Sequence, residues 1–293
     1  MGPILLIGAG GQLGTDLGRI LPASSLVGLK RADLDITDPA AVERALDTHA
    51  PTWVVNTAAF HRVDDIEKNE RGEAPLAFAV NAVAARGLAI ACERRGARLL
   101  HLSTDYVFGG GPPGPYAEDA PPAPLCVYGV SKLAGELLIR LASPRHVIVR
   151  SSGLYGVAGS AGKGGNFVET MLRLAAEGKD IRVVDDQILT PTYTEDLARA
   201  IARLLARDPP GGVYHLTNAG QCSWFQFAAH IFNLCKRTPR LSPTTSAAFN
   251  APARRPAHSV LRNTRAVALG VPPLPGWPEA LEAYLRAKGH LSR

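Results

Sequence analysis

A tyrosine and a lysine, Tyr128 and Lys132, stand four residues apart in the segment VYGVSK. Residues four apart share one face of a helix, so the two side chains would project side by side. A free phenol titrates at about pH 10, but a neighbouring ammonium group stabilises the phenolate and lowers the pKa of the phenol. The spacing therefore predicts a proton donor for a carbonyl oxygen, with Lys132 as its partner. The same spacing also arises by chance in many helices, so it does not identify a site by itself.

Hydroxyl side chains occur in the segment HLSTDYVFGG, directly after the fourth strand that we predict below. Ligands of parallel α/β sheets bind at the carboxyl ends of the strands, and Ser103 and Thr104 lie at such an end, with Tyr106 just beyond. We expect Thr104, rather than Ser103, to donate to the substrate oxygen and to align it with Tyr128. The alternative for Ser103 is a hydroxyl that caps the end of the strand.

Three glycines in the segment IGAGGQLGTDL, namely Gly8, Gly11 and Gly14, follow the first predicted strand and open a helix. Glycines at such positions allow a tight turn, a close approach of the backbone to a pyrophosphate, and close packing of helix on strand. The N-terminus of the helix offers unpaired N–H groups to the anion. We expect a dinucleotide site here, although a glycine-rich turn without a ligand is the alternative. No Gly-Lys-Ser/Thr follows, so a P-loop and phosphoryl transfer are not expected.

Two cations, Lys30 and Arg31, follow the second predicted strand in the segment GLKRADLDI. An acidic residue at this point would bind the adenosine ribose and favour NAD, whereas cations suit the 2′-phosphate of NADP. We therefore expect NADP(H), with NAD(H) as the alternative, since such a pair can also be solvated. Asp35 and Ile36 lie a little further on, where they could flank the adenine.

Short apolar runs alternate with helical patterns over the first 150 residues, which is typical of a parallel sheet covered on both faces. Strands are expected at Ile4–Ile7, Leu26–Leu29, Trp53–Thr57, Arg98–Leu102 and His146–Arg150, and helices at Leu13–Leu21, Ala40–His49, Leu76–Arg95 and Val127–Leu141. Right-handed crossovers make this an α/β, Rossmann-type doubly wound domain over residues 1–150.

The remainder, residues 151–293, is expected to form mainly a smaller C-terminal substrate-binding lobe, although segments near 181–215 could return to the sheet. It contains expected helices at Phe167–Glu177 and Thr194–Ala206 and a strand-like IRVV segment between them. A glycine-rich loop at 156–165 could close over a substrate, with Lys163 reaching a phosphate, or could be an ordinary flexible loop.

The composition of the chain excludes several classes of function. The 293 residues are 46% hydrophobic and 20% charged, and the net charge of +6 is scattered rather than gathered into a basic stripe, so no nucleic-acid partner is expected. The N-terminal segment is too short and too rich in glycine for a membrane span. The four cysteines form no CxxC pair and the eight histidines form no HxxxH motif, so we expect free thiols in the cytoplasm and no protein-built metal site.

Taken together, these segments resemble the extended short-chain dehydrogenase/reductase family and, within it, the dTDP-4-dehydrorhamnose reductase family. The resemblance runs nearly end to end, through GAGGQLG, VVNTAAF, LSTDYVF, PLCVYGVSKLAGE, GNF, DDQILTPT and ARRPAHS. It implies NADPH- or NADH-dependent reduction of the 4-keto group of a nucleotide-linked 6-deoxysugar, with dTDP-4-dehydro-L-rhamnose as the expected substrate.

The resemblance also implies roles for individual residues. Tyr128 is the expected proton donor, Lys132 its partner, and Thr104 the contact to the substrate oxygen. The residues assigned to the cofactor are Gly8, Gly11, Gln12, Leu13, Gly14, Lys30, Arg31, Asp35, Ile36, Ala58, Ala59, Ser103, Tyr128 and Lys132. The residues assigned to the substrate are Thr104, Asp105, Tyr106, Asn166 and Arg255.

The chain departs from the family pattern at Phe60, where a histidine is frequent, and at Gly153, where a tryptophan lies near the sugar. The glycine implies a larger pocket and leaves the identity of the sugar open. Asp16 and Glu195 match positions that bind magnesium at a dimer contact in some members, but surface carboxylates are usually solvated, and no metal is assigned.

Two other functions are compatible with the sequence. One is a reductase or epimerase of another nucleotide sugar, and an epimerase would retain its cofactor tightly. The other is a non-catalytic NADP-binding subunit, because the regulatory subunit of methionine adenosyltransferase resembles the same subfamily. A homodimer is compatible with these observations as well.

Overall fold

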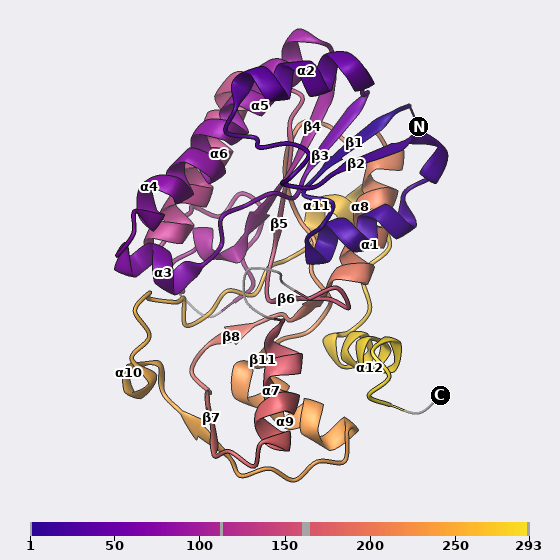
Figure 1. Cartoon of the computed structure of the whole chain (residues 1–293). Helices are drawn as coiled ribbons and strands as arrows, with labels where there is room; N and C mark the ends of the chain where they lie inside the picture. The colour runs from indigo at the N-terminus through magenta and orange to yellow at the C-terminus, as the bar shows by residue number, and fades with distance from the viewer. Residues whose placement is uncertain (1, 112–113, 160–164, 292–293) are drawn as a thin grey trace.

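The computed structural model describes residues 2–111, 114–159 and 165–291 (Figure 1). Its centre is a six-stranded parallel sheet in the order β10–β5–β4–β3–β1–β2. The strands are β1 (Ile4–Ile7), β2 (Leu26–Leu29), β3 (Trp53–Asn56), β4 (Arg98–Thr104), β5 (Val147–Ser151) and β10 (Gly212–His215). All five strands predicted in the first 150 residues are present, two with the predicted ends and three with ends that differ by one or two residues.

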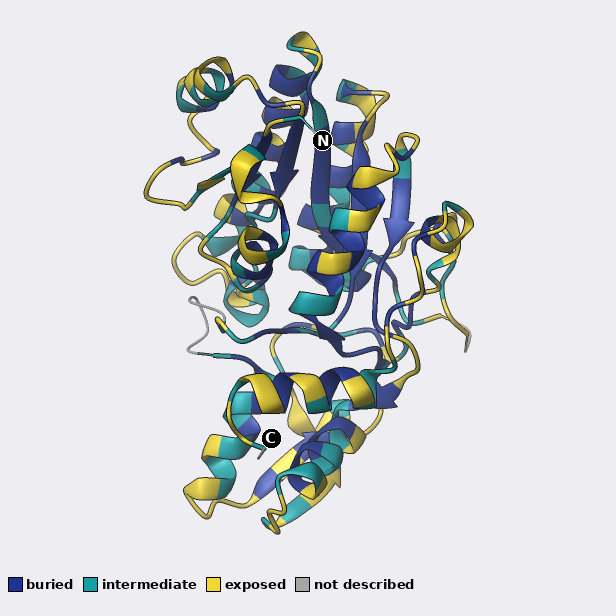
Figure 2. Ribbon diagram, turned by 90° about the vertical axis from the view of Figure 1, so that its right-hand side faces the viewer, coloured by how far each residue is buried: buried dark blue, intermediate teal, exposed yellow. Residues whose placement is uncertain are grey.

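Helices cover both faces of this sheet, and the alternation of side chains along each strand explains why. In β1, Ile4 and Leu6 belong to the core under α1 and α8, whereas Leu5 and Ile7 belong to the core under α2, α5 and α6. Continuous apolar strands are therefore buried on both sides, as Figure 2 shows. The helices are α1 (Gln12–Ile20), α2 (Pro39–His49), α5 (Ala85–Arg94), α6 (Val127–Ala142) and α8 (Thr194–Ala206).

The order of the strands places a crevice at one edge of the sheet. β1 lies between β2 and β3, so the chain leaves β1 toward one neighbour and later returns on the other side. Such a switch point opens a crevice at the carboxyl ends of the strands, where ligands of these folds bind. The glycine-rich turn and the start of α1 lie at that crevice.

Part of the chain after residue 150 returns to the sheet. Helix α8 packs against α1, and β10 pairs in parallel with β5. By contrast, β7 (Ile181–Val184), which lies within the same stretch, pairs with β12 (Leu241–Thr244) away from the sheet.

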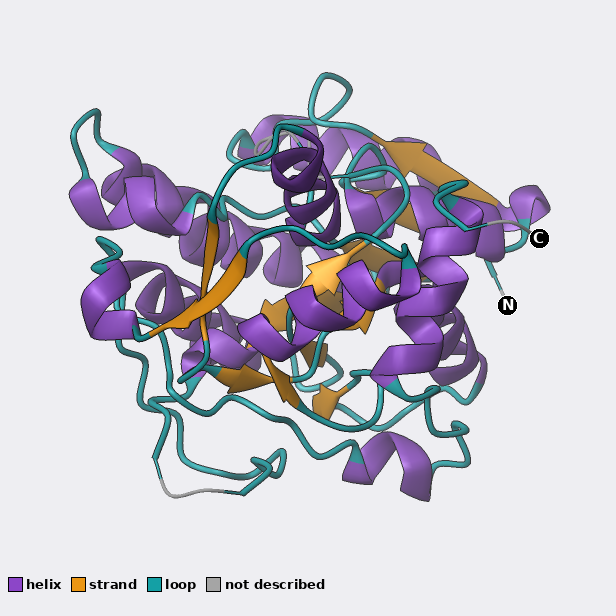
Figure 3. Ribbon diagram, turned by 90° about the horizontal axis from the view of Figure 1, so that it is seen from below, coloured by secondary structure: helices purple, strands orange, loops and turns teal. Residues whose placement is uncertain are grey.

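The remaining chain forms a smaller lobe with its own aromatic core, built around Tyr155, Phe227 and Tyr284. Figure 3, seen from below, shows its helices and short strands in front of the central sheet. Its other elements are β6 (Leu154–Tyr155), α7 (Phe167–Ala176), β8 (Ile188–Leu189), β9 (Thr192–Tyr193), β11 (Cys222–Ser223), α9 (Trp224–Leu234), α10 (Ser246–Phe249) and α12 (Trp277–Ala287).

One long helix spans Glu73–Arg94 and begins earlier than the expected Leu76. It consists of α4 (Glu73–Phe78), the π-helical turn η2 (Ala79–Ala84) and α5, and it packs beside α6. By length and composition it is the one helix of the described chain that could cross a membrane, but half of its most apolar stretch is buried inside the fold. Short elements complete the described chain: η1 (Ala23–Ser25), α3 (Val63–Lys68), η3 (Asp105–Val107) and α11 (Thr264–Ala268).

Candidate active site

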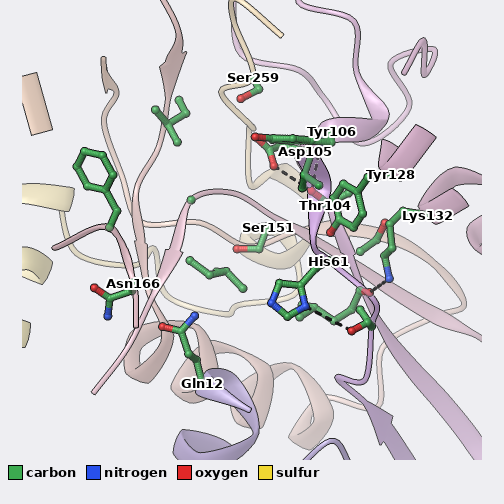
Figure 4. Close-up of a pocket in the computed structure, with 18 of the residues that line it drawn as sticks. Gln12, His61, Thr104, Asp105, Tyr106, Tyr128, Lys132, Ser151, Asn166 and Ser259 are labelled. Atoms are coloured by element: carbon green, nitrogen blue, oxygen red, sulfur yellow. Dashed lines mark hydrogen bonds between the residues drawn. The ribbon is translucent and has the colours of Figure 1, made fainter. Parts of the chain in front are cut away.

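A cavity of about 560 Å³ lies at the carboxyl edge of the sheet (Figure 4). Its wall is formed by the glycine-rich turn, the end of β4, the start of α6 and segments of the smaller lobe. Of the residues predicted from sequence, those that line it are Gly11, Gln12, Leu13, Gly14, Ala59, Ser103, Thr104, Asp105, Tyr106, Tyr128, Lys132, Asn166 and Arg255. Those that do not line it are Gly8, Lys30, Arg31, Asp35, Ile36 and Ala58.

The glycine-rich turn has the shape that a pyrophosphate requires. Gly8 has a φ of +84°, and a Cβ added to Gly14 would lie 2.1 Å from the Gly8 carbonyl oxygen. Gly11 caps α1 without a side-chain hydrogen bond, so the first N–H groups of the helix have no side-chain partner at the cap. The cradle thus fits the phosphates of a dinucleotide.

The residues expected at the adenosine end lie outside the cavity. Lys30 and Arg31 are exposed at the end of β2, and the Lys30 side chain runs beside Gly10. The Asp35 carboxylate accepts hydrogen bonds from the backbone and hydroxyl of Thr37, which lower its pKa. Their contact with a cofactor stays a prediction.

Tyr128 lies at the start of α6 with its ring edge-on to that of Tyr106, 5.7 Å between centroids. Its side chain has a hydrogen bond with Thr104, and burial raises the pKa of the phenol. Lys132 is not among the groups that shift this pKa. The expected lowering by a neighbouring ammonium is therefore absent from this structure, because desolvation of the phenolate dominates.

Lys132 shares the helix face and the cavity with Tyr128, as predicted, but its ammonium nitrogen has other partners. Nζ donates to the Leu102 carbonyl oxygen at 2.7 Å and lies 3.1 Å from His101 Nε2. The side chain is buried, and burial lowers its pKa to about 8, although Glu136 acts in the opposite direction.

Thr104 is held in place by the buried carboxylate of Asp105. The Thr104 hydroxyl donates to Asp105 Oδ1 at 3.1 Å, and the Ser152 hydroxyl donates to Asp105 Oδ2 at 2.9 Å. Ser259 adds a further hydrogen bond, and burial raises the pKa of Asp105. Asp105 is thus saturated by protein hydroxyls and fixes the position of Thr104.

Ser103 lines the cavity, but its hydroxyl donates to Glu136. Glu136 is in turn paired with the guanidinium of Arg150 at 2.6 Å, inside the fold. The Ser103 side chain is therefore a member of a buried ion-pair network. The Thr104 hydroxyl is engaged in a similar way by Asp105, so its contact with a substrate stays a prediction.

Arg255 comes from the chain far beyond the sheet and is paired with Asp64 of α3. Its two terminal nitrogens donate to the Asp64 carboxylate at 2.9 and 2.7 Å, and it also has a hydrogen bond with Tyr106. This pair fixes the guanidinium at the wall of the cavity, where an anionic group can approach it.

Asn166 is the N-cap of α7. Its Oδ1 accepts from the Glu169 backbone N–H at 3.1 Å, and its Nδ2 donates to the Gly156 carbonyl and to the Tyr284 hydroxyl, both at 3.0 Å. Gly156 also donates its N–H to Gln12 Oε1 at 2.9 Å, which links the glycine-rich turn to the smaller lobe. The side-chain amides of Asn166 and Gln12 therefore link separate segments of the cavity wall.

Sequence reasoning did not identify several residues of the cavity wall, notably His61, Phe167, Gln187 and Trp224. The Phe167 and Trp224 rings lie 4.6 Å apart and present an aromatic surface. His61 lines the cavity one position after Phe60, so a histidine is present although shifted by one residue. No periodicity or spacing in the sequence indicates that these side chains converge.

Gly153 has a backbone reason to be glycine. Its φ is +56°, and an added Cβ would lie 2.8 Å from Leu189 Cδ1 and 3.1 Å from Pro191 Cα. A side chain at this position would require the backbone to change.

No group of three or more potential His, Cys, Asp or Glu metal ligands occurs within the described residues. Asp16 accepts from the Thr194 hydroxyl at 2.5 Å, and Glu195 is paired with Arg199 at 2.6 Å. Lys163 lies outside the described residues.

The doubly wound sheet, the glycine cradle and the tyrosine and threonine beside it define a Rossmann-type oxidoreductase of the extended short-chain dehydrogenase/reductase class. The family model described as RmlD substrate binding domain matches residues 1–289. A dTDP-4-dehydrorhamnose reductase from Streptomyces griseus is 45% identical over 285 residues, which cover 94% of this chain and 91% of that protein. The chain belongs to the dTDP-4-dehydrorhamnose reductase family.

Two further relatives agree with this assignment. The spore coat polysaccharide biosynthesis protein SpsK of Bacillus subtilis is 40% identical over 290 residues, 98% of each chain. The crystal structure of the dTDP-4-dehydrorhamnose reductase of Bacillus anthracis in complex with NADP has a TM-score of 0.90 and 37% identity, and the match covers 98% of this chain and 100% of that one.

Proposed function

We propose that this enzyme uses NADPH to reduce the 4-keto group of a nucleotide-linked 6-deoxysugar, converting dTDP-4-dehydro-L-rhamnose to dTDP-L-rhamnose. The observation that carries this proposal is the joint placement of Tyr128 and Thr104 beside the glycine cradle, in one cavity. Family membership and the shape of the cradle support the choice of cofactor, with NAD(H) as the alternative.

When bound in this cavity, NADPH would supply the hydride for the keto carbon. Thr104, held by Asp105, positions the Tyr128 hydroxyl through the hydrogen bond between them, and this hydroxyl gives the keto oxygen its proton. The raised pKa of Tyr128 keeps the phenol protonated at neutral pH, which is the form that a proton donor needs.

We assign the substrate side of the cavity to the smaller lobe. Arg255 offers a fixed cation for the diphosphate, and the rings of Phe167 and Trp224 offer a surface for the base. This assignment supports the division into a dinucleotide-binding part, residues 1–150 with α8 and β10, and a substrate-binding part.

The test is NADPH consumption by the purified enzyme across a set of nucleotide-linked keto sugars. We expect turnover with dTDP-4-dehydro-L-rhamnose and a fall in activity of roughly tenfold or more when the base or the sugar is changed. If NADPH binds but no keto sugar is reduced, the catalytic assignment is wrong and a binding subunit is the better description.

A second candidate substrate is another 4-keto sugar, because Gly153 lines the cavity at the position where the family carries a large side chain near the sugar. The same set of sugars distinguishes the two candidates. An epimerase would instead be isolated with stoichiometric NAD and would need no added NADPH.

We also infer that a second copy of the chain packs on the outer face of α6 and the helix Glu73–Arg94. Five of the seven exposed large hydrophobic side chains in the described residues gather there: Leu76, Val83, Val130, Leu137 and Leu141. A helix pair of this length presents roughly 700 Å², close to the ~800 Å² per partner of a standard interface. Light scattering should give twice the mass of the chain, and a monomeric mass at all concentrations would exclude the dimer.

A cytoplasmic location is proposed on the strength of the biosynthetic relatives.

A further inference from the structure

Three polar side chains lie in a row beneath the cavity, where Lys132 of α6 reaches down to the sheet. Lys132 Nζ is 3.1 Å from Nε2 of His101 on β4, and His101 Nδ1 is 3.1 Å from Nδ2 of Asn56 on β3. The exposed fractions of the three residues are 1%, 0% and 1%. Because all three are shielded from solvent, each hydrogen position along the row constrains the next one.

The first constraint comes from the backbone. The Ala58 N–H donates to Asn56 Oδ1 at 3.0 Å, so the amide nitrogen is the atom of Asn56 that faces His101. An amide NH₂ group can only donate, and His101 Nδ1 must therefore accept. A neutral imidazole with an accepting Nδ1 carries its proton on Nε2, toward Lys132.

The second constraint falls on Lys132. An Nε2–H group can donate only to a lone pair, which the lysine nitrogen has as an amine and lacks as an ammonium. The opposite arrangement, an ammonium donating to Nε2, would set the His101 Nδ1–H against the Asn56 NH₂. Turning the Asn56 amide would only move the conflict to the Ala58 N–H.

We propose that His101, oriented by Asn56, is a positioning residue that donates its Nε2–H to Lys132 and so stabilises the amine form of the lysine. Lys132 then exchanges its proton with solvent near neutral pH, rather than remaining a permanent ammonium. His101 touches neither substrate nor cofactor in this scheme and acts only through Lys132.

The charges around Lys132 are compatible with this role. The titratable groups that share its surroundings are Tyr128 and Glu136 on α6, His101 on β4, Arg150 on β5, Asp105 and Tyr106 on η3, and His61 after β3. The carboxylate that raises the pKa of Lys132, Glu136, is already paired with Arg150. Burial lowers the pKa of both Lys132 and His101, so the ring stays neutral and the ammonium is less favoured than that of an exposed lysine.

The direct test is the tautomer of His101 in the full-length enzyme labelled with ¹⁵N-histidine, read from the nitrogen chemical shifts and from the ring protons coupled to each nitrogen. We expect Nε2 to be protonated and Nδ1 bare. The His101→Gln variant assigns the signal, and through-bond correlations in the wild type assign it if that variant does not fold. A proton on Nδ1, or on both nitrogens, would overturn the proposal. This measurement does not depend on any turnover.

A second test rests on the proposed function and on the role expected for Lys132 from the sequence, in which its ammonium form supports proton donation by Tyr128. Removing the donor in His101→Leu should destabilise the amine and move the alkaline limb of kcat upward by about one pH unit. His215→Leu is the control, because His215 is another fully buried sheet histidine and does not line the cavity. A limb that stays in place or moves downward in His101→Leu would refute the role. A wild-type enzyme that shows the expected tautomer but reduces no keto sugar would count against the reductase assignment alone.

Discussion

At the scale of single residues, the site depends on a phenol that burial keeps protonated. Thr104 is its hydrogen-bond partner, and Tyr106 packs edge-on against its ring. Burial is the largest cause of the raised pKa of this phenol, and the hydrogen bond with Thr104 acts in the opposite direction.

The Tyr128→Phe variant should lose activity by roughly 100-fold or more, because it removes the proton donor and keeps the ring. Binding of NADPH, followed by its fluorescence, should be unchanged. Tyr214→Phe is the control, since the Tyr214 hydroxyl donates to the Pro210 carbonyl away from the cavity. Turnover of Tyr128→Phe close to that of the wild type would remove Tyr128 from the mechanism.

The lowered pKa of Lys132 predicts that the free energy of unfolding depends on pH. Its pKa is about 8 in the folded chain, whereas an exposed lysine titrates at 10.5, so the unfolded chain binds more protons between these values. The cost of burying the ammonium is present in full below pH ~8 and disappears as the pH rises, by up to about 3 kcal/mol. The free energy of unfolding of the wild type should therefore rise from pH ~7.5 to about 9.5 relative to Lys132→Met. Denaturant titrations at each pH measure the difference, and a constant difference would contradict the lowered pKa.

At the scale of elements, the glycine turn and α1 form a unit whose shape depends on missing side chains. Gly14 is buried against the Gly8 carbonyl, whereas Gly18, one turn later, is exposed with no atom near its added Cβ. Glycine is thus required for close packing at position 14, whereas at position 18 an added methyl group would meet no other atom.

This contrast provides a matched pair of variants. Gly14→Ala should weaken NADPH binding by roughly tenfold or more and lower the melting temperature, because its Cβ would lie 2.1 Å from a backbone oxygen. Gly18→Ala should leave cofactor binding unchanged and stabilise α1 by about 1 kcal/mol. Thermal unfolding with and without NADPH measures both effects, and equal behaviour of the two variants would argue against the cradle.

At the scale of the whole molecule, the cavity exists because two parts of the chain meet. Arg255 reaches Asp64, and Gly156 reaches Gln12, across long separations in the sequence. Phe167 and Trp224 come from the helices α7 and α9 of the smaller lobe, so the substrate surface is made by the second core.

Trp224→Ala should raise the KM for the nucleotide sugar roughly tenfold, because stacking on a base is worth ~1–3 kcal/mol, and should leave the KM for NADPH unchanged. Phe249→Ala is the control, since Phe249 is an exposed aromatic residue on α10 that does not line the cavity. Steady-state kinetics with both substrates provide the test. An increase confined to the KM for NADPH would mean that the base of the nucleotide sugar does not stack on Trp224.

Local patterns in the sequence were sufficient to predict five of the six strands of the central sheet, all except β10, and the helix face that Tyr128 and Lys132 share. These features depend on periodicity, on the pairing of apolar runs and on the requirement for glycine in a tight turn. All of them can be recognised within a few residues of chain.

The partners of those residues, by contrast, depend on how the whole chain folds. Lys132 faces His101 and the Leu102 carbonyl instead of the phenol, Ser103 joins Glu136, and Asp105 is occupied by hydroxyls. The physical reason is burial: once a polar group leaves water, it must find a partner among whichever groups the fold brings near, and that choice is not encoded by spacing along the chain.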